Sequence, residues 1–194
     1  MVNLAQLFMQ KKCLFLSIFI YLLGANLSVF AQQIFIGAGV AFDNSFREWN
    51  IALDDEDFEA KITQRWQMQN DWTEWDVSWG KKNGVIRQKW KNDPSQWELR
   101  LNDDLVTMRT HWGKDINEWI ISDGKQELIL ETKYTGVPQA WEVKKNKNGK
   151  FNVAMFYEND PRDWEIEDNL TAEISDAMKL ATTFIAIFHS SPKR

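Results

Sequence analysis

The stretch EWDVSWGKKNGVIRQKW, from Glu74 to Trp90, decides the fold, because its pattern returns along the chain. It reappears as QWELRLNDDLVTMRTHW from Gln96 and as EWIISDGKQELILETKY from Glu118, each time 22 residues further on. Every copy has an aromatic second residue and an aromatic last residue. So short and regular a period indicates an internal repeat, in which each unit is one supersecondary element.

Aromatic residues mark the repeat at two positions. The first recurs at intervals of 22 to 26 residues, at Trp49, Trp75, Trp97, Trp119, Trp141 and Trp164. The second follows 15 to 17 residues later, at Trp66, Trp90, Trp112, Tyr134 and Phe156. Same-face neighbours in antiparallel strands lie close enough for their rings to pair. We therefore expect each second aromatic to stack on the next first aromatic, as a ladder along one end of a sheet.

Within each unit, apolar and polar residues alternate, as Trp75, Val77 and Trp79 do with the polar residues between them. Such alternation over short runs is typical of strands with one buried face. Turn-forming residues separate the two halves, for example GKKNG at 80–84 and NKNG at 146–149. Each unit is therefore predicted to be one β-hairpin, and the chain a long antiparallel meander.

The C-terminal run AMKLATTFIAIF, from 177 to 188, has no polar stripe. A helix that is apolar on all sides is a buried helix, so we predict one over 171–189, capped by Asp168, Asn169 or Thr171. About twelve alternating strands would leave long open edges in a flat sheet. We therefore expect a mainly β fold, in which the ~22-residue hairpin repeats curl into a barrel around this helix.

The first 31 residues have the order of a secretory signal peptide: two lysines, the apolar run LFLSIFIYLL at 14–23, and small residues ending in VFA. The apolar run is about half of the ~20 residues that a membrane-spanning helix needs. We therefore expect a cleaved signal over 1–31 and a single barrel domain over 32–194, in the periplasm or secreted, with no stable membrane insertion. An uncleaved N-terminal anchor is the alternative.

Charge and cysteine content limit the partners. The single cysteine, Cys13, falls in the expected signal, so we expect neither a disulfide nor a thiolate metal site after it. Residues 32–194 carry 21 Lys and Arg against 28 Asp and Glu. An acidic balance argues against nucleic acid, whose phosphates need clustered basic residues. It argues equally against electrostatic docking on anionic lipid.

Three units, EWIISDGKQELIL (118–130), AWEVKKNKNGKF (140–151) and DWEIED (163–168), precede the apolar C-terminal run. In this they resemble the tubby and LURP-one-like family, whose repeats have the form W-x-V/I-x-D-G. The resemblance implies a twelve-stranded antiparallel barrel threaded by a hydrophobic C-terminal helix. Members of that family include phosphoinositide binders with a basic headgroup pocket. No comparable cluster of Lys and Arg occurs in this sequence, so that activity is not carried over.

The residues that catalysis or metal binding would need are scarce. His111 is expected on the outer face of a strand and His189 at the helix end, as solvated or capping side chains. The acidic runs Asp54–Asp57 and Asp103–Asp104 offer oxygen ligands for calcium but lack the D-x-D-x-D-G order, so we expect solvated turns. No metalloprotease, serine-hydrolase or phosphate-loop motif occurs. We therefore predict no catalytic residue, no cofactor and no metal.

Trp72 and Trp79 are the candidate ligand contacts, because aromatic faces hold sugars and quaternary ammonium groups. Trp72 has the parity opposite to Trp75, which places it in a loop or facing outward, and Trp79 ends its strand at the other rim. Two functions follow. The first is a non-catalytic scaffold or protein-interaction module of the cell envelope. The alternative is a small-ligand or glycan-binding protein that uses aromatic residues at a barrel end.

Overall fold

The computed structural model describes residues 32–42, 45–134 and 137–193. The predicted signal peptide over 1–31 lies outside them. The described elements belong to one compact unit, Gln32–Arg194. Its strands are β1 Phe35–Val40, β2 Glu48–Leu53, β3 Ala60–Trp66, β4 Asp71–Trp79, β5 Lys82–Trp90, β6 Asp93–Leu101, β7 Asp104–Thr110, β8 Glu118–Ser122, β9 Glu127–Tyr134, β10 Val137–Val143, β11 Gly149–Tyr157 and β12 Asp160–Leu170. A short 3-10 helix, η1 Gln67–Gln69, follows β3, and an α-helix, α2 Asp176–Ser190, follows β12.

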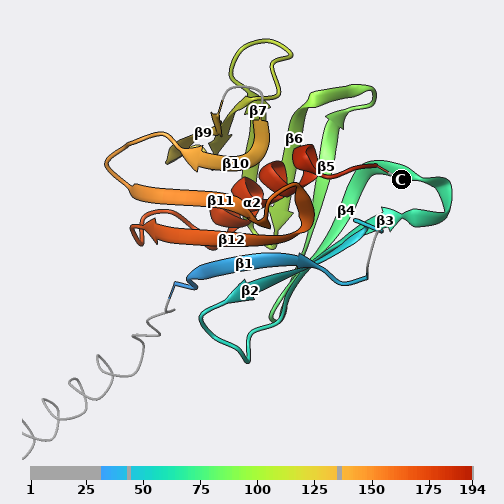
Figure 1. The fold of residues 1–194 in the computed structure, drawn as a ribbon, viewed down its shortest axis with the longest axis horizontal. Helices are drawn as coiled ribbons and strands as arrows, with labels where there is room; N and C mark the ends of the chain where they lie inside the picture. Colours follow the sequence, from blue (N-terminus) through green and yellow to red (C-terminus); the bar gives the residue numbers. More distant parts are fainter. Residues whose placement is uncertain (1–31, 43–44, 135–136, 194) are drawn as a thin grey trace, which may run out of the picture. The chain divides into compact units, whose positions relative to one another are not determined.

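The strands form a closed barrel (Figure 1). Each strand pairs antiparallel with the next one along the chain, and β1 closes the ring by pairing with β12, with Gly37 opposite Glu165 and Ala38 opposite Trp164. Among the described strands each one therefore has a neighbour on both sides, which removes the aggregation hazard of an open sheet. The predicted antiparallel meander and its closure into a barrel are confirmed.

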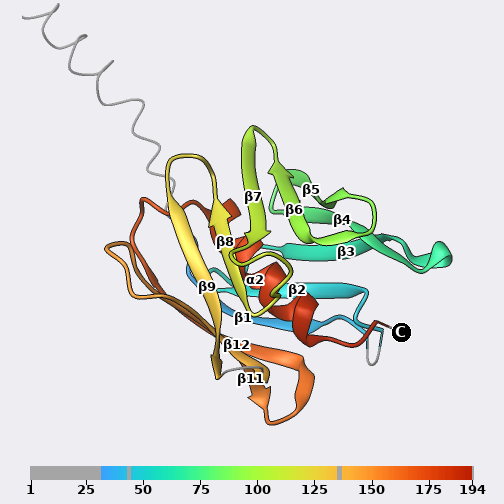
Figure 2. The ribbon, with the colours of Figure 1, turned by 90° about the horizontal axis from the view of Figure 1, so that it is seen from above.

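Helix α2 lies inside the barrel, where strands surround it in both views (Figures 1 and 2). Its residues from Ala177 to Ile187 are all buried. The helix begins later than the predicted 171–189, because β12 continues to Leu170 and a turn follows it. None of the three predicted caps is used. Ser175 is the N-cap, and its hydroxyl accepts a hydrogen bond from the N–H of Met178 at 3.3 Å.

The core is a layer of aromatic rings between the helix and the wall. The first aromatic of every repeat is at most 3% exposed, and these residues are Trp49, Trp75, Trp97, Trp119, Trp141 and Trp164. Phe184 of α2 packs edge-on against two of them, with ring centroids 5.7 Å from Trp75 and 5.4 Å from Trp97. Rings of this size fill the space between a central helix and a wide barrel.

The predicted aromatic ladder is wrong. Trp75 lies opposite Gln64, and not opposite Trp66, because the register between β3 and β4 shifts between Gln64 and Trp66. The same kind of shift occurs between β5 and β6, before Trp90. At both shifts one residue of the first strand faces three of its partner strand, and such a bulge re-aims the side chains beyond it. The second aromatic of the repeat is therefore turned away from the buried face that the first aromatic occupies.

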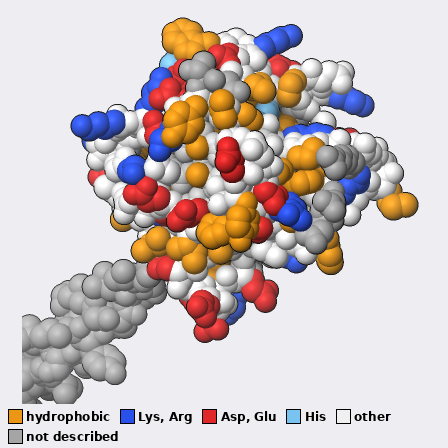
Figure 3. All heavy atoms as spheres, viewed as in Figure 1, with side chains coloured by type: hydrophobic (Ala, Val, Ile, Leu, Met, Phe, Trp, Pro, Cys, Tyr) orange, Lys and Arg blue, Asp and Glu red, His pale blue; other side chains and the backbone are white. Residues whose placement is uncertain are grey.

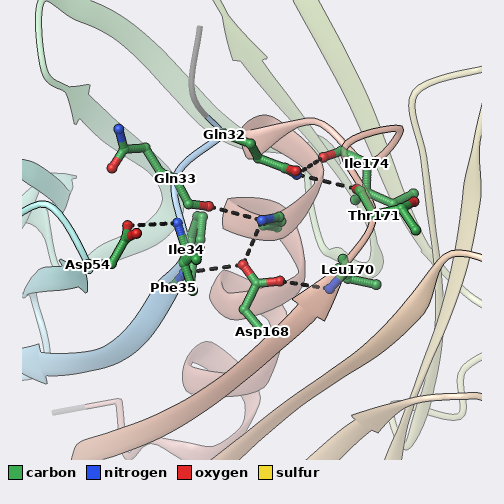
Figure 4. A network of polar contacts seen from close by, with 10 residues as sticks. Gln32, Gln33, Ile34, Phe35, Asp54, Asp168, Leu170, Thr171 and Ile174 are labelled. Carbon is green, nitrogen blue, oxygen red and sulfur yellow. Dashed lines mark hydrogen bonds and ion pairs between the residues drawn. The ribbon is translucent and has the colours of Figure 1, made fainter.

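A buried ion pair ties the barrel seam to the helix (Figure 4). The ammonium of Lys179 lies 2.6 Å from the Asp168 carboxylate, with side chains only 2% and 1% exposed. Lys179 also donates to the carbonyl of Gln33 at 2.9 Å, and Asp168 accepts the N–H of Phe35 at 3.2 Å. Burying a charge is costly unless it is paired and hydrogen-bonded, and both charges are. The network therefore fixes the start of β1 and the end of β12 to α2.

Candidate functional site

One end of the barrel carries most of the exposed hydrophobic side chains. Because neighbouring strands are antiparallel, the loops that follow β1, β3, β5, β7, β9 and β11 all lie at the same end. Each of these six loops, or the strand end before it, presents at least one large hydrophobic residue that is 36% to 96% exposed. We call this set the aromatic rim: Phe42, Trp66, Met68, Trp90, Trp112, Ile116, Tyr134, Val137, Phe156 and Tyr157.

The concentration at this end is strong. Of the 13 large hydrophobic residues that are exposed in the described part of the chain, ten belong to the aromatic rim. The other three, Ile34, Ile36 and Leu105, lie beside or within strands β1 and β7. Single exposed hydrophobic residues need no explanation, but a concentration at one place marks an interaction site. The aromatic rim is therefore the candidate functional site.

The turns behind the rim share one hydrogen-bonding pattern. An asparagine with positive φ, between 51° and 72°, turns the chain at Asn70, Asn92 and Asn159. Asparagine tolerates this left-handed conformation better than most residues. An aspartate follows each, and its carboxylate accepts the N–H two residues further on at 2.9 to 3.1 Å, in the pairs Asp71–Thr73, Asp93–Ser95 and Asp160–Arg162. The turns are therefore held by side chains as well as by the backbone.

Hydroxyl groups strengthen two of these turns. The side chain of Thr73 donates to Asp71 at 2.6 Å, and that of Ser95 donates to Asp93 at 2.5 Å. These bonds, followed by those from the backbone N–H groups, hold the pKa of Asp71 and of Asp93 below its ordinary value. Both carboxylates are therefore charged at neutral pH and occupied in holding the loops.

Buried indoles attach the same loops to the core. In five repeats the tryptophan Nε1–H donates to the carbonyl three residues earlier, at 2.8 to 3.2 Å; the pairs are Trp49–Phe46, Trp75–Trp72, Trp97–Pro94, Trp119–Ile116 and Trp164–Pro161. Trp141 differs and donates to the hydroxyl of Ser190 at the end of α2. A surface held in place before binding loses less conformational entropy when a partner arrives.

Trp72 lies at the inner edge of this end of the barrel. It belongs to β4 and is half-buried against the core, with its ring centroid 5.8 Å from that of Trp75, so the prediction that it lies in a loop or faces outward is wrong. The guanidinium of Arg47 lies 5.4 Å from its centroid. With Phe188 and Lys193, Trp72 lines a small cavity of about 10 Å³. That volume holds about one water molecule, so the hollow is too small for a sugar.

Trp79 lies at the opposite end of β4 and belongs to the core. It is 3% exposed, stacks on Phe35 at 5.3 Å between centroids, and meets the edge of Phe58 at 5.2 Å. Its ring is therefore not accessible to a ligand. Of the two tryptophans selected from the sequence, Trp72 alone lies near the aromatic rim, and the two are not brought together.

The histidines have structural contacts. His111 Nδ1 lies 2.6 Å from Glu118, and its ring stacks on Trp112 of the rim at 4.4 Å. Glu118 also accepts a hydrogen bond from Lys144 at 2.9 Å. Lys144 and His111 together hold the pKa of Glu118 below its usual value. Burial lowers the pKa of His189 to about 3, so its ring is neutral where it packs 4.8 Å from Trp119.

Neither acidic run forms a metal cluster. Within the part of the chain that the structure describes, no group of three His, Cys, Asp or Glu side chains is placed to hold a metal ion. Asp54 accepts the N–H of Ile34 at 2.9 Å, and Asp55 accepts that of Asp57 at 3.1 Å, so these carboxylates stabilise a loop. No helix among the described residues is long and apolar enough to cross a membrane.

Comparison of the chain with protein-family models, curated proteins and solved structures finds no match to any of them. The candidate site therefore rests on the geometry alone. Sequence reasoning found the rim aromatics as a repeat but placed them in the core. The polar residue two positions before them, Gln64 in β3 and Gln88 in β5, was the signal, because it is this residue that pairs with the buried tryptophan.

Proposed function

We propose that this protein is a non-catalytic docking domain of the cell envelope, and that the aromatic rim is its docking surface. The observation that carries the proposal is the concentration of exposed hydrophobic residues on all six loops at one end of the barrel. Removal of such surfaces from water favours association, at about 25 cal/mol for each Å² of apolar area. The location in the envelope rests on the signal-like order of residues 1–31.

The polar groups around the rim support binding over catalysis. Asp71 and Asp93 hold turns, and Glu118 is bonded to both His111 and Lys144. Groups engaged in this way position a loop and are not poised to transfer protons to a substrate. The rim is thus built as a fixed surface of rings supported from behind by turns.

Glycan binding is the second candidate, and the exposure of Trp66, Trp90 and Trp112 favours it. These tryptophans occupy equivalent positions in successive repeats, two strands apart. Neighbouring strands are about 4.8 Å apart, so the rings recur at roughly 10 Å around the rim. A polysaccharide that follows the rim would meet a ring at regular intervals and stack its sugar faces there.

The full-length chain, produced in a bacterium and separated into soluble and envelope fractions, tests the docking function. The rim variant Trp90→Ser/Trp112→Ser is compared with the matched control Ile36→Ser/Leu105→Ser, which also removes two exposed apolar side chains but leaves the rim intact. We expect wild type and control in the envelope fraction and the rim variant in the soluble one. Equal partition of all three proteins would overturn the proposal.

Co-sedimentation with insoluble polysaccharides and peptidoglycan distinguishes the second candidate. Retention that the rim variant loses and the control keeps would make the partner a glycan. Membership of the tubby and LURP-one-like family stays a proposal too. Its support is the twelve-stranded barrel around a C-terminal helix.

A further inference from the structure

The shape of the aromatic rim restricts what can cover it. Twelve strands about 4.8 Å apart and tilted by about 40° enclose a barrel about 24 Å wide between opposite walls. The rim residues lie on the six loops at one end of that barrel. Among the described residues, the hollow beside Trp72 at this end has room for about one water molecule. A partner that contacts all six loops must therefore be at least as wide as the barrel.

The rim is interrupted by charge. Lys89, Lys91, Lys114 and Lys133 are exposed next to or near its rings, and the aspartates Asp71 and Asp93 lie within its turns. On the face shown in Figure 3, hydrophobic side chains likewise reach the surface in separate groups with charged side chains between them. A stable protein interface has a contiguous apolar centre with charges at its margin, which is the opposite arrangement.

Separate rings that alternate with positive and negative charges are better suited to a lipid surface than to a protein surface. Tryptophan and tyrosine have an apolar body and a polar atom, and both concentrate where lipid headgroups meet acyl chains. Zwitterionic headgroups offer a phosphate to each lysine and an ammonium to each carboxylate. A fluid bilayer surface can also close around separate side chains, which a rigid protein face cannot do. The wall behind the rim stays polar, since Arg65 pairs there with Glu74 and Asp76.

We propose that the aromatic rim docks on the interfacial region of a bilayer of zwitterionic lipids, with its rings inserted among the headgroups. This inference rests on the proposed docking function and names its partner. The attraction comes from apolar burial, because the domain is acidic overall and its rim carries both signs of charge. Binding is therefore independent of anionic lipid and insensitive to salt.

Flotation with phosphatidylcholine vesicles tests the proposal. Residues 32–194 are used, because all the described strands and the helix that fills the barrel lie within them and form one compact unit. We expect the protein to float with the vesicles equally at 0.1 and 0.5 M NaCl, conditions for which screening lengths differ about twofold. Vesicles with brominated acyl chains should quench Trp66, Trp90 and Trp112, because exposed rings enter the interface while the buried ones stay inside the barrel.

The rim variant Trp90→Ser/Trp112→Ser should weaken vesicle binding about 100-fold, on the basis of about tenfold for each ring. The control Ile36→Ser/Leu105→Ser should stay within about twofold of wild type. All four positions are exposed, so far-UV circular dichroism should show folded barrels in both variants. Phe156→Ser is an independent third rim position and should also weaken binding.

Three results would overturn the lipid inference: no flotation of the wild type, flotation lost at high salt, or equal binding by the rim variant and the control. If the wild type does not float with vesicles but the rim variant is still found in the soluble fraction of cells, the docking function stands. The partner would then be a protein or a glycan. If the rim variant stays in the envelope fraction as well, both proposals fail.

Discussion

Replacement of Lys179 by methionine tests the buried network directly. The change removes the ammonium and leaves the Asp168 carboxylate, 1% exposed, with the backbone N–H groups of Phe35 and Leu170 as its donors among the described residues. Breaking a buried pair by removing one partner costs about 3 to 5 kcal/mol. Because Asp168 keeps two donors, we expect the lower value, about 3 kcal/mol of unfolding free energy. For a domain of this size that lowers Tm by about 6 to 12 °C.

Urea unfolding at neutral pH, followed through the emission of the buried tryptophans, measures this loss. The matched control is Lys150→Met, because Lys150 and Glu167 make an ion pair at 2.7 Å with side chains 56% and 49% exposed. Exposed pairs contribute at most about 1 kcal/mol, so the control should change little. The double variant Lys179→Met/Asp168→Leu should recover most of the loss. A single-variant loss below about 1 kcal/mol, or strictly additive losses in the double variant, would refute the reasoning.

Three further outcomes are expected. The pKa of Asp71 lies below the 3.8 of the free side chain, so its charged form adds to the free energy of unfolding at neutral pH. That stabilisation disappears as pH falls through the lowered pKa. Acid unfolding of Asp71→Asn should lack this part of the pH dependence of stability. Gly84→Ala should cost about 2 kcal/mol in thermal unfolding, because a Cβ there meets the carbonyl oxygen of Arg100, whereas Gly39→Ala should cost less, because the nearest atom to a Cβ there is a side-chain oxygen of Asp163 that can move aside. Iodide should quench only a minor fraction of tryptophan emission in the free protein, and substitution of the three rim tryptophans by phenylalanine should abolish that fraction.

The barrel was predictable because its signals are repetitive and local. Alternation with period two and turn residues at fixed spacing recur in each unit, so an error in one unit does not change the fold. Closure of the sheet into a barrel was predicted from the C-terminal helix, because an apolar helix without a polar stripe must be covered on all sides. Each of these inferences depends on residue type alone, and each is confirmed.

The rim was not predictable in the same way, because a local irregularity of a few residues decides it. The alternation that places Gln64 on the buried face places Trp66 there too, but one residue between Gln64 and Trp66 in β3 faces three residues between Asp71 and Trp75 in β4. A bulge of this kind re-aims the side chains beyond it. The error therefore reversed the environment of the second aromatics while leaving every strand in place.

Long-range polar contacts could not be predicted from the sequence either. Asp168 looked like a helix cap because it precedes the helix, yet its partner is Lys179 inside that helix. No sequence pattern predicts the contact of Gln33, whose carbonyl accepts a hydrogen bond from the same Lys179 ammonium. Such contacts depend on where the closed barrel brings the chain, and no local propensity encodes them.

Closure through β1 and β12 has a consequence for the order of events during synthesis. Hairpins from β2 to β11 can form as the chain emerges, since each needs only its neighbour. Strand β1 has β2 beside it early, but its other partner is made last among the strands, and the helix that fills the interior is later still. Contacts so distant along the chain slow folding. An interrupted chain would present an open, unfilled sheet to proteases, so only a translation product that extends through the helix can become resistant to them.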